Sequence, residues 1–255
     1  NLYGEGPNDN GQYVIESPEQ TPNYIALGQS NNLNTSDSDI CIIGINSNGL
    51  EQWVRNIQYG NSVNEQGNYI FRLSGGGYIV AGTKQINHWY DLLMMKVNND
   101  GTQSSSWSFG GSYNEVGNFA QEVSGGYIVA GTKQISHWYD LLMMKVNNDG
   151  TQSSSWSFGG SYNEVGNFAQ EVSGGYIVSG STESYGQGLY DAWVVKTNDD
   201  GEEIYNHTFG GSLDDEALGG VKSINGDPVI VGYTKSFGNG GEDILLIVLD
   251  QDYQP

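Results

Sequence analysis

The sequence has few basic residues and no concentration of positive charge. Nine Lys and Arg residues stand against 30 Asp and Glu residues, so the formal charge of the 255-residue chain is −21. A surface that follows nucleic-acid phosphates needs clustered Lys and Arg side chains, and an anionic membrane attracts the same side chains. We therefore expect neither nucleic acid nor an anionic membrane surface as a partner.

Cysteine, long apolar runs and a leader segment are also scarce or missing. No apolar run approaches the 18 or so residues that cross a bilayer, so no membrane insertion is expected. Cys41 is the single cysteine and lies in the run Ile40-Cys41-Ile42-Ile43, which indicates a small buried side chain. Because the sequence starts without Met and without a basic and apolar leader, we expect a mature chain whose signal peptide has been removed.

Glycine is abundant, and an internal repeat organises the chain. Residues 76–129 recur as residues 125–178 with a shift of 49 residues, and the only difference is Asn87 against Ser136. The near-identical copies are residues 76–124 and 125–173. Surface positions match as closely as apolar ones, which indicates a recent duplication, gene conversion or engineering. The identity of these loops therefore reflects how the repeat arose and is not by itself evidence of a shared function.

Weaker copies flank this pair and predict the fold. An aspartate opens an apolar run in each of five copies of about 51 residues: Asp39, Asp91, Asp140, Asp191 and Asp243. Within one copy we predict a loop over residues 134–139 and four strands, over residues 116–123, 127–133, 140–146 and 151–158, with Gly and Asn turns between the others. Four antiparallel strands repeated at this length are typical of a propeller blade. The sequence predicts an all-β, five-bladed β-propeller as a single domain, residues 1–255.

The first residues of the sequence match a part of the repeat that the last copy lacks. The last copy stops after its third strand, residues 244–249, whereas Leu2-Tyr3-Gly4 aligns with the end of the fourth strand in other copies. We predict that this N-terminal segment completes the fifth blade and closes the ring, which would pair strand edges that are otherwise open.

The repeat resembles that of a known group of proteins. Gly175-Tyr176-Ile177-Val178-Ser179-Gly180, the run from Tyr190 to Gly201 and Phe209-Gly210-Gly211-Ser212 are similar to the repeat of secreted β-propeller proteins of bacteria and archaea. The resemblance covers all five copies. It implies the fold and an extracellular or cell-surface setting, and it implies no particular ligand.

One recurring acid follows the fourth strand of each copy. Ring closure would bring five such carboxylates to one mouth of a central channel: Asp9, Glu65, Glu115, Glu164 and Asp215. Neighbours about 8 Å apart would repel each other by about 2 kcal/mol at an effective dielectric constant near 20. A shared cation such as Ca²⁺ would relieve the repulsion, since hard cations take oxygen ligands. The alternative is that each acid caps its own turn in solvent, and no cofactor is certain.

Aromatic residues in the predicted loops of one face are the candidate ligand-binding set: His88, Trp89, Tyr90, His137, Trp138, Tyr139, Tyr185, Tyr190 and Phe237. A sugar ring stacks its C–H face on an indole or phenol, and nearby amides can bind its hydroxyl groups. The alternative is that these rings pack over a blade edge. Trp53, Trp107 and Trp156, within fourth strands, are expected to pack in the core or between blades.

Signals for catalysis are weak, and we predict that the protein is not an enzyme. The sequence has no nucleophile elbow, phosphate loop or zinc spacing, and its recurring acids lack the asymmetry of a glycosidase pair. The prediction is a secreted or cell-surface, lectin-like binding module for a glycan or a surface partner. The alternative is a structural or assembly-forming propeller, with or without a bound cation, and a glycosidase-like enzyme is the third interpretation.

Overall fold

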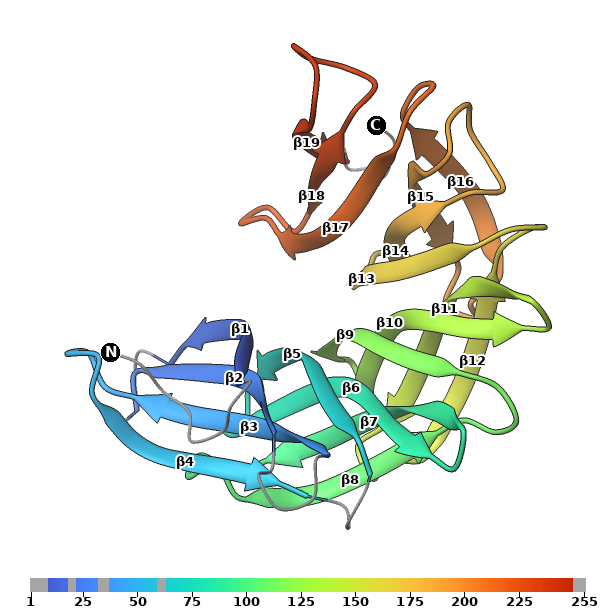
Figure 1. The fold of residues 1–255 in the computed structure, drawn as a ribbon. Coiled ribbons are helices and arrows are strands. Elements are labelled where there is room, and N and C mark those ends of the chain that lie inside the picture. Colours follow the sequence, from blue (N-terminus) through green and yellow to red (C-terminus); the bar gives the residue numbers. More distant parts are fainter. Residues whose placement is uncertain (1–8, 18–21, 32–36, 59–62, 250–255) are drawn as a thin grey trace. The chain divides into compact units, whose positions relative to one another are not determined.

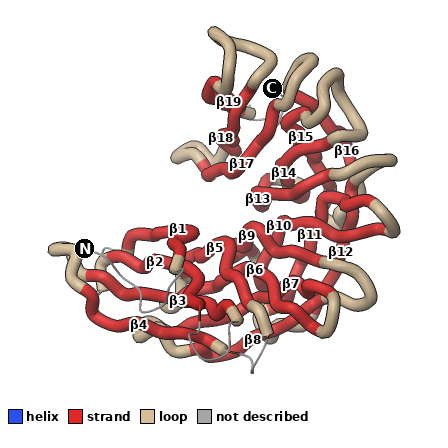
Figure 2. Tube along the Cα trace, viewed as in Figure 1, coloured by secondary structure: helices blue, strands red, loops and turns tan. Residues whose placement is uncertain are grey.

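A computed structural model describes residues 9–17, 22–31, 37–58 and 63–249, which form 19 β-strands (Figures 1 and 2). The described part of the chain contains no helix that could span a membrane. By their internal contacts, residues 1–122 and residues 123–255 form two compact units, and each is described by itself.

The first unit holds two antiparallel sheets of four strands, in the orders β1-β2-β3-β4 and β5-β6-β7-β8, and ends with strand β9. The strands are β1 (Asn10–Glu16), β2 (Tyr24–Asn31), β3 (Ser38–Ile45), β4 (Glu51–Ile57), β5 (Glu65–Arg72), β6 (Tyr78–Ile86), β7 (Trp89–Val97), β8 (Gln103–Phe109) and β9 (Glu115–Val123).

The second unit begins at the hairpin after β9, and the third sheet has the order β12-β11-β10-β9. Two further sheets follow, in the orders β13-β14-β15-β16 and β17-β18-β19. The strands are β10 (Gly126–Ile135), β11 (Trp138–Asn147), β12 (Gln152–Phe158), β13 (Glu164–Val172), β14 (Gly175–Thr182), β15 (Asp191–Thr197), β16 (Glu203–Phe209), β17 (Asp215–Lys222), β18 (Pro228–Thr234) and β19 (Asp243–Val248).

These sheets confirm the predicted fold class, an all-β five-bladed β-propeller. Each blade is an up-and-down meander, and the fifth has three strands in the described residues, as its shortened last copy predicts. Residues 2–4, which we predict to supply its fourth strand, lie outside the described residues.

The second and third strands of a blade are continuous apolar runs because they are covered on both faces. Every residue of β14 and β15 is buried. In the first unit, buried side chains of the first and second blades join in one core that includes Ile25, Ile42 and Tyr78. The outer strands carry Ser and Gln instead, and alternate between exposed and half-buried positions.

A bulge recurs in the innermost strand of the blades and helps to join neighbours. The register shifts around Asn68 in β5 and around Asn167 in β13. A bulged residue is left unpaired in its own ladder. At these bulges the side-chain amide of Asn68 donates from Nδ2 to the carbonyl of Gly117 at 2.9 Å, and the side-chain amide of Asn167 donates from Nδ2 to the carbonyl of Ala217 at 2.8 Å. The bulges thus tie one blade to the next within each unit.

The prediction of a long loop around His88 in the second blade, and of its copy around His137 in the third blade, is wrong. Ile86 pairs with Trp89, and Ile135 pairs with Trp138, so both connections are two-residue hairpin turns. The first turn residue has a positive φ, 59° at Asn87 and 61° at Ser136. Two-residue hairpins require positive φ because only such turns match the strand twist. Residues 89–90 and 138–139 are therefore strand residues, whereas residues 183–190 form a long connection as predicted.

Candidate functional site

Exposed aromatic side chains pair where the third strand of one blade meets the segment leading into the next. The ring of Trp89, at the start of β7, lies 5.9 Å from the ring of Tyr113, just before β9. The ring of Trp138, at the start of β11, lies 5.4 Å from the ring of Tyr162 in an edge-to-face arrangement. We call these pairs the first and second aromatic junctions. Trp138 is 43% exposed and Tyr162 is 51% exposed, so both rings offer area to a ligand.

Backbone hydrogen bonds fix the two strands that carry each pair. The Tyr90 backbone N–H donates to Oδ1 of Asn114 at 2.9 Å, and the Tyr139 backbone N–H donates to Oδ1 of Asn163 at 3.2 Å. At the second junction, the Tyr162 backbone N–H also donates to the hydroxyl of Ser184 at 2.9 Å. The rings therefore project from a backbone that is ordered before any ligand arrives, which lowers the entropic cost of binding.

A pair of carboxylates lies behind the second aromatic junction. Asp140 follows Trp138 by two residues on β11, so both side chains lie on one face of the strand. A Cβ built on Gly159 would come closer than 3.0 Å to both Asp140 Oδ1 and Glu164 Oε2. The two carboxylates thus face each other beside this glycine. Burial, followed by the charge of Glu164, raises the pKa of Asp140 above its ordinary value.

The first aromatic junction is built in the same way. Asp91 is buried two residues after Trp89, and a Cβ on Gly110 would overlap its carboxylate. Burial raises the pKa of Asp91, and the charge of Lys84 partly offsets this effect.

The fourth and fifth blades keep this frame but change the exposed pair. Counted from the strand-opening aspartate, Leu189 corresponds to Trp138; it lies in the long connection before β15 rather than in a strand, and it is 67% exposed. Counted from the recurring acid, Leu213 corresponds to Tyr162 and is 50% exposed. A Cβ on Gly210 would again overlap two carboxylates, those of Asp191 and Asp215. We call this arrangement the leucine junction.

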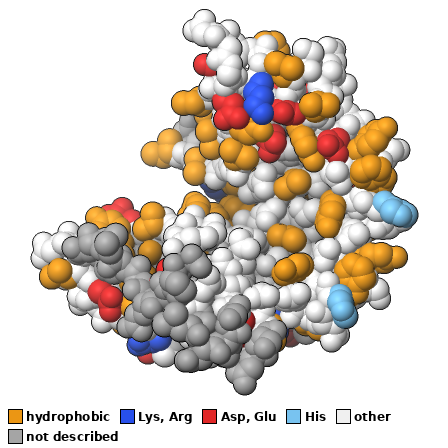
Figure 3. Space-filling view, in the orientation of Figure 1, with side chains coloured by type: hydrophobic (Ala, Val, Ile, Leu, Met, Phe, Trp, Pro, Cys, Tyr) orange, Lys and Arg blue, Asp and Glu red, His pale blue; other side chains and the backbone are white. Residues whose placement is uncertain are grey.

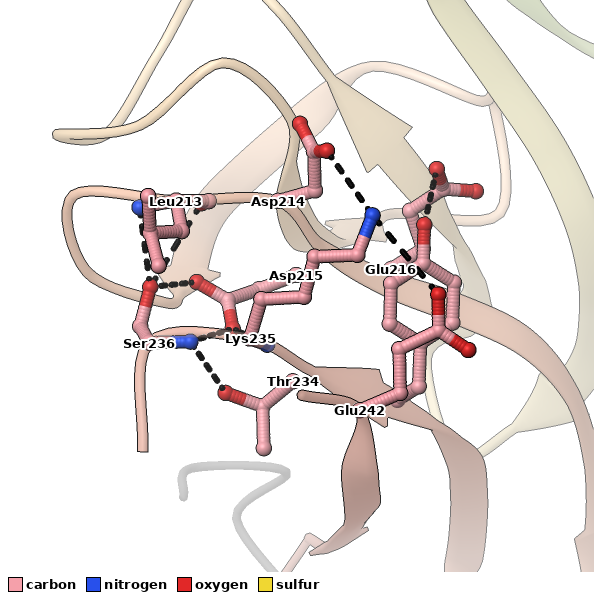
Figure 4. A network of polar contacts seen from close by, with 9 residues as sticks. Leu213, Asp214, Asp215, Glu216, Thr234, Lys235, Ser236 and Glu242 are labelled. Atoms are coloured by element: carbon pink, nitrogen blue, oxygen red, sulfur yellow. Dashed lines mark hydrogen bonds and ion pairs between the residues drawn. The ribbon is translucent and has the colours of Figure 1, made fainter. Parts of the chain in front are cut away.

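The recurring acid of the fifth blade is held by its own loop (Figure 4). Asp215 accepts hydrogen bonds from the backbone N–H of Gly211 at 2.8 Å, from that of Lys235 at 3.1 Å and from the hydroxyl of Ser236 at 2.5 Å. Burial would raise the pKa of Asp215, but hydrogen bonds from Ser236, Thr234 and Gly211 outweigh it and lower the pKa. Nearby, Lys235 Nζ lies 3.1 Å from Asp214 and 3.6 Å from Glu242.

Glu164 has an equivalent set of partners. It accepts the backbone N–H groups of Gly160 at 3.0 Å and Ser184 at 3.2 Å, and the hydroxyl of Thr182 at 2.9 Å. Each of these two carboxylates accepts one N–H group from its own turn, that of Gly160 or Gly211, as one interpretation of the sequence predicts. Each also accepts donors from the end of the second strand of its blade, and both are buried rather than solvated.

The five recurring acids do not form a described metal centre. Glu65 and Glu115 are buried at the starts of β5 and β9, and Asp9 accepts the Asn31 backbone N–H at 3.3 Å. Among the residues that the structure describes, no group of three or more His, Cys, Asp or Glu side chains could hold a metal ion. The described geometry therefore gives the Ca²⁺ hypothesis no support.

In the fourth and fifth blades, the strand-opening aspartate accepts hydrogen bonds from backbone N–H groups of the loop that precedes it. Asp191 Oδ2 accepts the backbone N–H groups of Gln187 at 2.8 Å and Gly188 at 3.0 Å, and Asp243 Oδ2 accepts that of Asn239 at 3.1 Å. These hydrogen bonds give Asp191 and Asp243 a structural role, because they hold the loop that precedes the strand. In the second and third blades the two-residue turn leaves no such loop before the aspartate.

The other predicted aromatic residues lie near these junctions. The hydroxyl of Tyr185 donates to the carbonyl of Gly159 at 2.9 Å, which brings this exposed ring beside the second aromatic junction. Tyr190 is half-buried, and burial followed by the charge of Glu183 raises its pKa to about 12. Phe237 is 60% exposed in the corresponding place near the leucine junction.

Two tryptophans of the outer strands pack as expected. A Cβ on Gly101, in the turn between β7 and β8, would overlap the ring of Trp53 of the first blade. A Cβ on Gly201 would likewise overlap the ring of Trp156. Both turn glycines have positive φ, and they let the next blade approach the indole face. The predicted packing between blades is confirmed for Trp53 and Trp156.

Sequence reasoning overlooked the partners of the exposed tryptophans. Tyr113 and Tyr162 stand two residues before the recurring acids, in the only two copies that also carry Trp two residues before the strand-opening aspartate. This joint occurrence of Tyr and Trp is visible in the sequence and could have predicted that the two side chains are in contact. The histidines lie instead in the hairpin turns, where His137 Nδ1 is 3.1 Å from the Ser136 hydroxyl.

No protein-family model and no curated protein matches the chain.

Proposed function

We propose that the protein is a multivalent binding module that takes carbohydrate at its two aromatic junctions. The observation that carries this proposal is the second junction, where Trp138 and Tyr162 remain about half exposed although their backbone is fixed by hydrogen bonds. An edge-to-face pair offers two differently inclined ring faces. The C–H face of a sugar can stack on the indole while its edge contacts the phenol.

The packing alternative is weaker at these positions. A tryptophan that serves the core of this protein looks like Trp193, which is 1% exposed. The leucine junction keeps an equivalent glycine and two carboxylates with leucines in place of Trp138 and Tyr162, so the frame does not need this aromatic pair. The aromatic pairs are therefore best explained by a ligand.

Two junctions per chain suit a repeated ligand. A shallow site worth about 4 kcal/mol binds near millimolar, and linked sites can raise the overall affinity by about 10² to 10⁴ when the ligand is repeated. We propose a glycan polymer or a glycosylated surface as the partner, and an extracellular or cell-surface setting. Under this proposal the protein binds and does not turn over its ligand.

A second candidate function, assembly with other chains, is favoured by the last blade. Ile244, Leu246 and Val248 alternate along β19, so they lie on one face of the strand, and each is more than half exposed. An exposed apolar surface of this kind is typical of contacts between proteins. A concentration-dependent increase in molecular mass in light scattering would support assembly, and a constant monomer mass would exclude it.

The carbohydrate proposal is tested by replacing Trp89 and Trp138 with Leu in one variant. Leucine is tolerated at the equivalent Leu189, so the variant should melt close to the parent. On an array of neutral, acidic and amino-sugar glycans, binding by the parent should be lost in this variant. Leu189→Ala is the matched control and should retain binding. Absence of glycan binding by the parent, or retention of binding without the two indoles, would contradict the proposal.

A further inference from the structure

The second aromatic junction lies in a negative electrostatic environment. Asp140, Glu164 and Glu183 surround it, against one cross-strand lysine, Lys133. Glu164 accepts hydrogen bonds on both carboxylate oxygens, from the Gly160 backbone N–H and from the Thr182 hydroxyl. In Figure 3, few Lys and Arg side chains are visible on the face shown, in agreement with the charge of −21.

The exposed ring of Tyr185, at this junction, lies in the same negative electrostatic potential. Tyr185 is 42% exposed, and its hydroxyl contacts Gly159, the glycine beside the carboxylate pair. Its pKa is raised by burial and then by the charges of Glu164, Glu203 and Asp140. The negative potential of buried Glu164 and half-buried Asp140 therefore extends to the exposed aromatic surface.

A neighbouring pair of residues distinguishes this junction from others. Asn163 donates to Glu183 Oε2 at 2.7 Å. In the second blade the equivalent Asn64 donates to a neutral Gln85 at the same distance, 2.7 Å. In the fifth blade, Asp214 pairs with Lys235 instead. The same contact is thus made with an acidic, a neutral or a basic partner, and the second aromatic junction has the acidic one.

Resting on the proposed carbohydrate function, we propose that the second aromatic junction selects glycans that carry ammonium groups, such as unacetylated amino-sugar polymers. Aromatic faces attract cations through their ring quadrupole, and nearby carboxylates add to that attraction. An acidic sugar is repelled by the same charges. A neutral sugar gains the stacking alone.

The test uses three hexamers of known composition: glucosamine, N-acetylglucosamine and galacturonic acid. Isothermal titration at about 20 mM salt should give glucosamine hexamer an affinity about tenfold above that of the N-acetylated hexamer. The advantage should shrink at about 0.5 M salt because mobile ions screen the carboxylates. The uronate hexamer should bind least.

Glu183→Gln is the diagnostic variant, because Gln85 makes the same contact in the second blade and the fold should tolerate it. It should reduce the affinity for the glucosamine hexamer severalfold and leave that for the N-acetylated hexamer unchanged. Glu242→Gln, at the exposed acid near the leucine junction, is the matched control and should change neither affinity.

The outcomes separate the two proposals. Equal binding of both amino-sugar hexamers, with the indoles required, would overturn the charge selectivity and leave the carbohydrate function standing. Glucosamine hexamer binding that survives loss of both indoles would show adsorption by charge alone, and would overturn the selectivity at this site. Failure of the parent to bind any glycan of the array would contradict the carbohydrate function itself.

Discussion

The second aromatic junction and the leucine junction lie in the same unit and share one frame. Each has a glycine between two facing carboxylates, Gly159 in one and Gly210 in the other. They differ in the exposed pair, Trp138 with Tyr162 against Leu189 with Leu213. The glycine and the two carboxylates occur in both junctions, so we assign them a structural role. The exposed side chains differ between the junctions, and we therefore expect these side chains to recognise the ligand.

The largest effect should come from filling the glycine positions. Gly159→Ala and Gly210→Ala each push a Cβ into two carboxylates, and overpacking of this kind costs roughly 1 to 3 kcal/mol. Both variants should lose stability in chemical unfolding. Gly219→Ala is the control, because nothing lies within 4 Å of its Cβ position. A loss at one junction alone would show that the frames are not equivalent.

The carboxylates of the two junctions should respond to pH in opposite ways. The folded-state pKa of Asp215 is lowered, so its contribution to stability is present above the ordinary pKa and is lost as the pH falls through the folded value. The folded-state pKa of Asp140 is raised, so its contribution is present below the ordinary pKa and is lost as the pH rises through the folded value.

Two Asn variants measure this contrast. At pH 7, Asp215→Asn should lower the melting temperature, because an amide cannot accept all the donors that Asp215 binds. Asp140→Asn should leave the melting temperature unchanged or raise it, and its advantage should shrink as the pH falls toward 4. Equal losses in both variants at pH 7 would contradict the assigned roles.

The smallest effect concerns the exposed ion pair of the fifth blade. Asp214 and Lys235 are both partly exposed, and such pairs contribute about 0 to 1 kcal/mol. The double change Asp214→Asn with Lys235→Glu recreates the Asn163–Glu183 contact of the fourth blade. Its free energy of unfolding should stay within about 0.5 kcal/mol of the parent, whereas Lys235→Glu alone places like charges together and should lose more.

Blade number and most strands could be predicted from the sequence because the repeat and its strand-opening aspartates are local signals. The hairpin tips could not, because positive φ at Asn87 and Ser136 is uncommon outside glycine and leaves no mark in the pattern. The partnership of Trp138 with Tyr162 joins two blades over 24 residues, so it depends on how strands align. The prediction that residues 2–4 complete the last blade stays a prediction.

The most direct test of the central claim is to transplant the aromatic pair. In a variant with Leu189→Trp and Leu213→Tyr, the leucine junction should become a third site. Titration with a short glycan bound by the parent should give two sites per chain in the parent, three in this variant and none in the variant lacking Trp89 and Trp138. The same stoichiometry in all three proteins would contradict the claim that the exposed pair, on its shared frame, is the binding site.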